Sequence, residues 1–425
     1  MELYLKNIGK VAEANVEIKG ITVIAGENDT GKSTVGRALF SIFNGFYEIE
    51  EQIRQERLLS IVSVLQMLYG NVYFLMSSRQ IKGVEEYAKE ILDKAQEYKK
   101  DDKLLINDMY LEFVEEAEGS KLFLKKVDFE DIAKRIQDIL CVSEHDIFQS
   151  VMNKKINAEF NGQLLNIYSA SDGIISFKVK GEELTVTVLE NAVSVNEINH
   201  CLHTEAVYID DPFVLDDMDI MALPKNQNYT DHRVQLVHKL AFERKNSGVV
   251  DEIVVEKRLQ KMYDMISSVC DGSIVRQKNS RIGYRLRNSD KTLSVKNLST
   301  GLKTFAILKT LLTNGIITNN GTIILDEPEI HLHPEWQLLF AELIVLLYKE
   351  FHMHILLNTH SPYFLRAIEV YSAKYGVSDV CRYYLSEVNE EGTAYMSDVT
   401  SEINKIYLKL SKPLQQLEDE RWNID

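Results

Sequence analysis

Residues 21–34 decide the fold, and they read Ile21-Thr22-Val23-Ile24-Ala25-Gly26-Glu27-Asn28-Asp29-Thr30-Gly31-Lys32-Ser33-Thr34. The first five form a continuous apolar run, which is typical of a strand covered on both faces. The next eight, from Gly26 to Ser33, fit the pattern G-x-x-x-x-G-K-[ST], and apolar residues at Val35, Leu39 and Ile42 follow at helical spacing. We therefore expect a strand, a glycine-rich loop and a helix, in that order.

This glycine loop has the composition of a phosphate site. Gly26 and Gly31 let the loop wind so that successive backbone N–H groups face inward. Lys32 is suited to place a positive charge on the β- and γ-phosphates of a nucleotide, and the hydroxyl of Ser33 is suited to ligate Mg²⁺. The sequence therefore predicts binding of a nucleoside triphosphate.

An acidic pair ends a second apolar run, Thr322-Ile323-Ile324-Leu325. We assign Mg²⁺ to Asp326 and the general base that accepts a proton from the attacking water to Glu327. An isolated acidic pair at a strand end is usually a polar turn, but the preceding phosphate loop favours the catalytic interpretation.

Two further segments are candidates for contacts with phosphate. Ser299-Thr300-Gly301 opens a helix whose first amides are unpaired, so Ser299 is a γ-phosphate ligand, an N-cap, or both. His360 follows the apolar strand 354–359, where it either donates a hydrogen bond to phosphate or the attacking water or serves a structural role.

Taken together, these segments resemble the Walker A, signature, Walker B and switch-histidine motifs of an ABC-type ATPase head. Asn28 and the run from Asp326 to Pro334 are similar to the SMC/RecF/OLD branch, in particular to standalone ATPases of bacterial anti-phage systems such as PtuA of Septu and AriA of PARIS. The resemblance implies ATP and Mg²⁺ as cofactors, and Asn28, Thr34 and Gly301 as further nucleotide-binding residues. It also implies a head-to-tail homodimer, or a higher homo-oligomer, in which the signature of one subunit completes the nucleotide site of another.

The chain departs from this family pattern at two places. Lys303 replaces the neutral glutamine that ends the signature, and Asp211 stands where related repair ATPases carry the glutamine that switches the two lobes. Gln163 is a second candidate for that glutamine, so the choice between Gln163 and Asp211 stays open.

The expected organisation is an α/β, two-lobed ABC-type P-loop ATPase head with a largely helical insertion and an antiparallel β subdomain. The expected boundaries are 1–45 for the N-terminal part of the head, 46–173 for the helical insertion, 174–215 for the β subdomain and a core strand, 216–290 for a helical lobe, and 291–425 for the C-terminal part of the head.

Composition narrows the class of protein further. The chain has 425 residues and a formal net charge of -16, which disfavours indiscriminate binding to nucleic acid. Cys141, Cys201, Cys270 and Cys381 form no C-x-x-C motif, so we expect buried thiols rather than zinc ligands or disulfides. The N-terminus lacks the basic start and the apolar run of a signal peptide. No apolar run approaches the roughly 20 residues that a membrane-spanning helix needs, so we expect a cytoplasmic protein.

One stretch of the chain is basic, although the net charge of the whole chain is negative. Residues 276–291 carry Arg276, Lys278, Arg281, Arg285, Arg287 and Lys291 against a single acidic residue, Asp290. The stretch is either a nucleic-acid groove or the solvated face of a hairpin, and the scarcity of stacking aromatics favours the solvated face. His331 and His333 lack a third ligand nearby, which argues against zinc.

The resulting hypothesis is an ATPase that acts as a nucleotide switch on a separate effector, a nuclease or toxin, in anti-phage defence. The alternative is a RecF-like repair ATPase that closes on DNA. The residues after His360 contain no cluster of acids at strand ends, so we expect any nuclease to be a separate chain.

Overall fold

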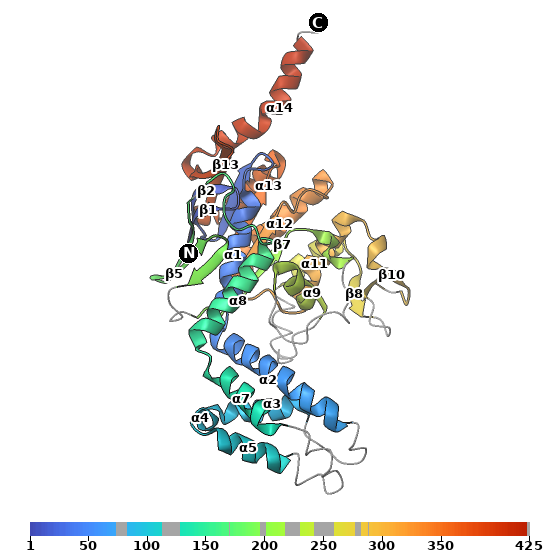
Figure 1. The fold of residues 1–425 in the computed structure, drawn as a ribbon. Coiled ribbons are helices and arrows are strands. Elements are labelled where there is room, and N and C mark those ends of the chain that lie inside the picture. Colours follow the sequence, from blue (N-terminus) through green and yellow to red (C-terminus); the bar gives the residue numbers. More distant parts are fainter. Residues whose placement is uncertain are drawn as a thin grey trace. The chain divides into compact units, whose positions relative to one another are not determined.

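The computed structural model describes residues 1–73, 83–112, 128–169, 171–195, 201–216, 230–241, 259–276, 282–287 and 289–422. The chain forms two compact units (Figure 1). The first consists of Met1–Tyr47 and Met152–Asp425, and the second of Glu48–Val151.

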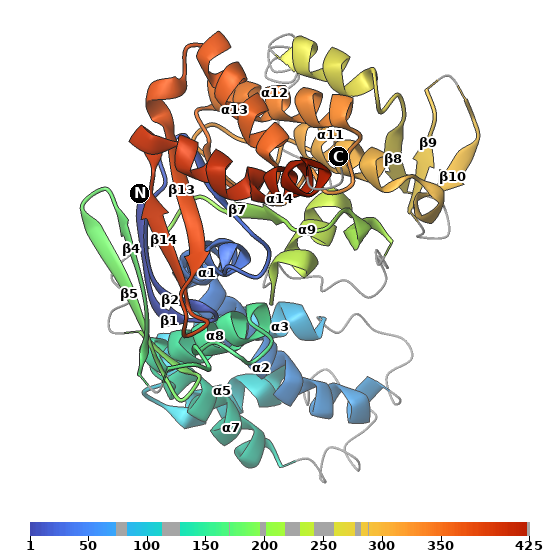
Figure 2. The same ribbon diagram turned by 90° about the horizontal axis from the view of Figure 1, so that it is seen from above.

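A sheet of 11 strands forms the centre of the first unit, in the order β6-β5-β4-β1-β2-β14-β13-β3-β12-β11-β7 (Figure 2). The strands are β1 (Glu2–Ile8), β2 (Val11–Glu17), β3 (Ile21–Gly26), β4 (Gly173–Val179), β5 (Glu182–Leu189), β6 (Ala192–Val195), β7 (Ala206–Ile209), β11 (Thr322–Asp326), β12 (His354–Thr359), β13 (Cys381–Val388) and β14 (Ala394–Asp398). Strands β13, β3, β12, β11 and β7 are mutually parallel, whereas β6, β5, β4, β1 and β2 pair antiparallel. Because β3 lies between β13 and β12, segments from both ends of the chain build one head.

The parallel strands are covered on both faces, which explains their continuous apolar runs. On one face, Ile21 and Val23 join the large core made with the later helices. On the other face the sheet packs against α1 (Lys32–Phe46), where a Cβ on Gly36 would lie 3.1 Å from a methyl group of Ile324. A glycine at this position lets the helix approach the sheet closely.

The remaining elements of the first unit complete the head. The helices are the C-terminal half of α8 (Glu144–Glu159), α9 (His232–Ala241), α11 (Thr300–Thr313), α12 (Pro334–Phe351), α13 (Pro362–Lys374) and α14 (Asn404–Trp422). A second sheet has three antiparallel strands, β8 (Ser273–Arg276), β9 (Ile282–Arg285) and β10 (Thr292–Ser294). Strands β9 and β10 form a hairpin.

The second unit is helical in its described residues and has a core of its own. Its helices are α2 (Ile49–Tyr73), α3 (Val84–Asp93), α4 (Ala95–Tyr98), α5 (Asp102–Tyr110), α7 (Phe129–Cys141) and the first half of α8. Helix α7 buries Phe129, Ala133, Ile136 and Leu140, which share one helical face.

The expected α/β fold class is confirmed, but one detail of the cysteine prediction is wrong. Cys270 and Cys381 are buried, whereas Cys141 is exposed and Cys201 is only partly covered. Cys141 directly follows the buried Leu140, so the turn of about 100° per residue carries it off the buried face of α7. Among the helices of the described residues, none combines the length and apolarity needed to cross a membrane.

Candidate functional site

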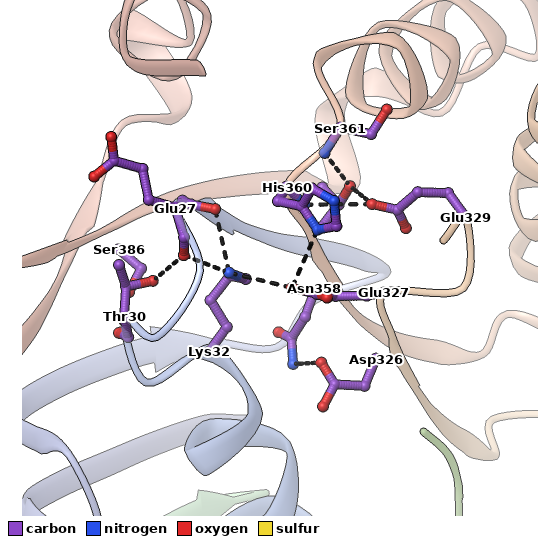
Figure 3. Close-up of polar contacts among 12 residues, drawn as sticks. Glu27, Thr30, Lys32, Asp326, Glu327, Glu329, Asn358, His360, Ser361 and Ser386 are labelled. Carbon is purple, nitrogen blue, oxygen red and sulfur yellow. Dashed lines mark hydrogen bonds and ion pairs between the residues drawn. The ribbon is translucent and has the colours of Figure 1, made fainter. Parts of the chain in front are cut away.

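The glycine loop joins β3 to α1 and packs closely against Ser386 of β13. A Cβ on Gly26 would lie 2.5 Å from the carbonyl oxygen of Ser386, so this position accepts only glycine. The Ser386 hydroxyl donates to the Thr30 carbonyl, and the Thr30 hydroxyl donates to the Glu27 carbonyl at 2.9 Å (Figure 3). Asp29 and Gly31 have φ of 60° and 80°, and anion-binding loops use such left-handed backbone to gather N–H groups.

Lys32 is held inside this loop. Its ammonium group is buried and donates to the carbonyl oxygens of Gly26 at 3.2 Å and Glu27 at 2.7 Å. It also lies 3.3 Å from Oε1 of Glu327 (Figure 3). The positive charge is therefore placed where a phosphate bound by the loop amides would meet it.

A cavity of about 540 Å³ opens beside the loop, which is within the size range of small-molecule sites. Of the residues expected at the site from sequence, six line it: Gly31, Lys32, Ser33, Thr34, Gln163 and Glu327. Seven do not: Gly26, Asn28, Ser299, Gly301, Asp326, His360 and Asp211. Asn28 is exposed.

Asp326 is fixed at the carboxyl end of β11 by two hydrogen bonds. Oδ2 accepts from the hydroxyl of Tyr208 at 2.9 Å, and Oδ1 accepts from the side-chain amide of Asn358 at 2.9 Å. Tyr208, on the neighbouring strand β7, was not singled out from the sequence, although its register beside β11 follows from the parallel pairing. Asp326 lines a second cavity of about 270 Å³, which shares Glu327 with the first.

Glu327 lies beside the ammonium group of Lys32 and the imidazole of His360. Its Oε1 lies 3.3 Å from Nζ of Lys32 and 3.3 Å from Nδ1 of His360. The hydrogen bond with His360 is the largest effect lowering the pKa of Glu327; burial opposes it and the charge of Lys32 adds to it. Its φ of 47° is uncommon for a residue with a side chain, and such backbone outliers cluster at functional sites. Glu327 is therefore a carboxylate at neutral pH.

A second glutamate, Glu329, positions the segment that carries His360. Glu329 is almost fully buried and accepts hydrogen bonds from the hydroxyl of Thr359 and from the backbone N–H of His360. Burial raises the pKa of Glu329. The pKa of His360 is also raised, chiefly by its hydrogen bond with Glu327. The sequence places Glu329 in the Walker B run but does not indicate this contact.

The predicted signature segment lies at the start of α11, where Ser299 is the N-cap residue. Its side chain is exposed and makes no capping hydrogen bond to the helix. A Cβ on Gly301 would lie 2.9 Å from the carbonyl oxygen of His331, so the signature turn packs against the loop after Walker B. Neither Ser299 nor Gly301 is among the described residues that line the cavity of the glycine loop.

Lys303, which replaces the family glutamine, is engaged elsewhere. Its ammonium group is buried and donates to both carboxylate oxygens of Asp216, at 2.7 and 2.6 Å. It also lies 4.9 Å from the ring centroid of Phe213. This substitution is explained by packing rather than by contact with phosphate.

The two candidates for the lobe-switching ligand lie in different cavities. Gln163 lines the glycine-loop cavity together with Ser33, whereas Asp211 lines the smaller cavity with Asp326. The carboxylate of Asp211 accepts a hydrogen bond from the backbone of Phe213 and so caps a short 3-10 helix.

A buried charged cluster that the sequence did not reveal lies behind Tyr208. His232 lies 2.7 Å from Glu159 and 3.1 Å from Asp210, and its ring stacks on Tyr208 with centroids 4.3 Å apart. Burial lowers the pKa of His232, but the hydrogen bonds with Asp210 and Glu159 outweigh it and raise the pKa to about 9. Asp210 has a pKa of about 2, because its bonds with His232 and Arg233 outweigh burial. The signal that could have found the cluster is the acidic end of strand 206–209.

Other sequence candidates have less defined settings. Among the basic stretch, Arg276, Arg285, Arg287 and Lys291 are exposed on or beside β8, β9 and β10, and Lys278 and Arg281 lie outside the described residues. His331 stacks edge-on against Phe213 at 5.7 Å, and no cluster of three or more metal-ligating side chains occurs among the described residues.

The donor set fits a nucleoside triphosphate with Mg²⁺. The loop offers left-handed backbone at Asp29 and Gly31, a buried cation at Lys32 and an adjoining cavity. Within the described residues, the Ser33 hydroxyl makes no hydrogen bond, and hydroxyl and carboxylate oxygens are the ligands Mg²⁺ prefers. The fold and the site together are those of a P-loop nucleotide-binding domain.

A family model identifies the class of this domain. Residues 1–365 match the AAA ATPase domain, and the chain belongs to that family of nucleotide-binding ATPases. Similar solved structures include an SMC head bound to the C-winged helix domain of ScpA, with 10% identity, a TM-score of 0.44, and coverage of 95% of this chain and 98% of that one. A second is the SMC head domain from Thermotoga maritima, with 13% identity, a TM-score of 0.37, and coverage of 94% and 98%. A third is a Smc head domain with an extended coiled coil bound to the C-terminal domain of ScpA derived from Pyrococcus furiosus, with 11% identity, a TM-score of 0.38, and coverage of 99% and 98%.

Proposed function

We propose that this protein hydrolyses ATP between two copies of itself, with the glycine loop of one copy and the signature turn of the other around each nucleotide. The proposal rests on one observation, which concerns the hydroxyl group of Ser299. Its hydroxyl is exposed and makes no capping bond, and it lies outside the cavity lined by Lys32 of the same chain. A second copy supplies the missing contact, because a helix N-terminus with an unused hydroxyl suits the γ-phosphate.

Within one copy, the residues take separate roles. The loop amides and Lys32 hold the phosphates, while Ser33 and Asp326 are the ligands for Mg²⁺, which supplies positive charge beside the transferred phosphoryl group. Gln163 is the favoured lobe-switching ligand, because it shares a cavity with Ser33.

Glu327 is the general base for the attacking water, oriented by His360. In the structure, Lys32 and His360 both stabilise the carboxylate and lower its pKa. When a phosphate takes up the charge of Lys32, that stabilisation weakens and the basicity of Glu327 rises. The base is thereby strengthened when nucleotide is bound.

The dimer is expected to act as a nucleotide switch on a separate effector, a nuclease or a toxin, in anti-phage defence. The γ-phosphate gives the signature turn an anion to bind, and hydrolysis removes that anion. The resemblance of the motifs to the standalone defence ATPases supports this role. Co-purification of a tagged native protein with its effector tests it, and recovery of no partner in either nucleotide state argues against it.

The Glu327→Gln variant tests the dimer. It is expected to bind ATP without hydrolysing it and to run as a dimer with ATP and Mg²⁺, but as a monomer without nucleotide. Size-exclusion chromatography with light scattering measures the mass, and Glu391→Gln, in the exposed turn between β13 and β14, is the matched control. A Glu327→Gln protein that binds ATP and stays monomeric refutes the proposal.

A RecF-like ATPase is the second candidate, because Arg276, Arg285, Arg287 and Lys291 are exposed on or beside one small sheet. The net charge of -16 weighs against it. A mobility-shift assay with duplex DNA, with and without ATP over a salt series, separates the two functions. ATP-dependent and salt-sensitive binding favours the RecF-like function.

A further inference from the structure

An exposed apolar turn contributes to the lining of the glycine-loop cavity. Ile167 and Tyr168 line the cavity and are 66% and 58% exposed. The cavity has two aromatic lining residues, and the other, Phe160, is buried. Within the described residues the Tyr168 hydroxyl makes no hydrogen bond, so it is the ring of Tyr168 that this turn presents.

The turn has a defined local geometry. The backbone N–H of Ser169 donates to the carbonyl of Asn166 at 3.1 Å, which makes Ile167 and Tyr168 the two central residues of a β-turn. The side chain of Asn166 accepts from the Tyr168 N–H at 2.9 Å, as asparagine does at the first position of such turns. Central residues of a turn project their side chains outward.

This turn is anchored to the hairpin between β1 and β2. Asn166 is buried and donates its backbone N–H to the carbonyl of Asn7 at 3.1 Å. The N–H of Gly9 donates to the carbonyl of Leu164 at 2.8 Å. A Cβ on Gly9 would lie 3.0 Å from the side chain of Thr34, so the same hairpin packs against the first turn of α1. The exposed turn is therefore held at a fixed place relative to the phosphate loop.

The ring of Tyr168 is also supported from behind. Three of its ring carbons lie 3.7 to 3.9 Å from the position that a Cβ on Gly392 would occupy. Gly392 has φ of 83° in the turn between β13 and β14, so glycine suits this position on two counts. The ring packs on backbone on one side and is open to solvent elsewhere.

We propose that Ile167 and Tyr168 form the subsite for the base of the bound nucleotide, with the ring of Tyr168 stacked on the base. The inference rests on the proposed function, because it assumes that the phosphates occupy the glycine loop. The same cavity is lined by the phosphate loop and by the exposed turn of Ile167 and Tyr168, so it offers a phosphate-binding loop and an apolar surface to one ligand, as a nucleoside triphosphate requires. Every base has a π-face, and its stacking on an aromatic ring stabilises binding.

Binding measurements with two probes test the subsite. The probes are ATP and inorganic tripolyphosphate, which has the phosphates but no base, and isothermal titration calorimetry gives the dissociation constants. Tyr168→Ala is expected to weaken ATP binding about tenfold and to leave tripolyphosphate binding unchanged. Tyr168→Phe keeps the ring and is expected to bind ATP like the wild type. Tyr395→Ala, which changes an exposed tyrosine outside the cavity, is the matched control.

The outcomes separate the subsite from the proposed function. If Tyr168→Ala binds ATP as tightly as the wild type, the subsite is refuted while the phosphate site stands. If the wild type binds neither probe, the proposed function fails first. Ile167→Ala is a second test of the same turn, and it too is expected to weaken ATP binding and to leave tripolyphosphate binding unchanged.

Discussion

Replacing His232 by glutamine should change how the stability of the protein depends on pH. His232 is buried between Glu159 and Asp210, and these partners raise its pKa from 6.5 to about 9. A pKa that is higher in the folded than in the unfolded chain means that the folded protein binds the proton more tightly. The contribution to stability is therefore complete below about pH 6.5 and is lost as the pH rises through about 9.

The size of this contribution follows from the pKa. One pKa unit corresponds to about 1.4 kcal/mol, so the cluster contributes about 3 kcal/mol when His232 is fully protonated. About 2 kcal/mol of this disappears between about pH 7 and about pH 9.5. The pKa of Asp210 lies near 2, so Asp210 stays ionised across this window and does not contribute to the change.

Urea unfolding at a series of pH values, followed by the fluorescence of Trp336 in α12, measures the effect. The free energy of unfolding of the wild type should fall by about 2 kcal/mol more than that of His232→Gln between about pH 7 and about pH 9.5. His333→Gln, a change at an exposed histidine, should follow the wild-type curve. Parallel curves for the wild type and His232→Gln would show that the cluster does not hold a proton and would refute the reasoning.

Three further substitutions test single contacts. Lys32→Ala should weaken ATP binding about 10- to 100-fold, because it removes the buried charge beside the loop amides. Titration with a fluorescent ATP analogue measures the affinity, and an unchanged affinity contradicts the phosphate site. Tyr208→Phe should lower the free energy of unfolding by about 1 to 3 kcal/mol, because Oδ2 of Asp326 loses the hydrogen bond from the Tyr208 hydroxyl. A urea unfolding curve that matches the wild type would contradict this contact. Lys303→Gln should lower the free energy of unfolding by about 3 kcal/mol, because the ion pair with Asp216 is lost, and should leave the affinity for ATP unchanged. Weaker ATP binding at unchanged stability would show instead that Lys303 contacts phosphate.

The local features of the site could be predicted from the sequence because each is encoded by neighbouring residues. The run from Ile21 to Ser33 specifies the strand, the loop and the start of the helix without reference to the rest of the chain. The strand ending at Asp326 is equally local. These features fixed the fold class and the position of the phosphate loop.

The partners of these residues could not be predicted because they come from distant segments. Tyr208 reaches Asp326 from 118 residues away, and His232 reaches Glu159 from 73 residues away. Such contacts depend on the register of neighbouring strands and on helix packing. The role of Lys303 was hidden for the same reason, since Asp216 lies 87 residues earlier in the chain.

The separation of Ser299 from Lys32 within one chain is the feature on which the account depends. Ser299 and Gly301 lie outside the cavity that Lys32 lines. Under the proposed function, the P-loop of one copy and the signature turn of another together form each nucleotide site. If two copies share each site, a defect in the P-loop and a defect in the signature turn should complement one another when they are on different subunits.

Mixing two inactive variants measures this directly. Lys32→Ala and Ser299→Arg should each lack ATPase activity, while Ser411→Arg, on the exposed side of α14, should retain it. An equimolar mixture of the two inactive proteins should recover about a quarter of the wild-type rate, because half of the randomly paired dimers contain one intact site out of two. A mixture that is no more active than its separate components would contradict the shared site.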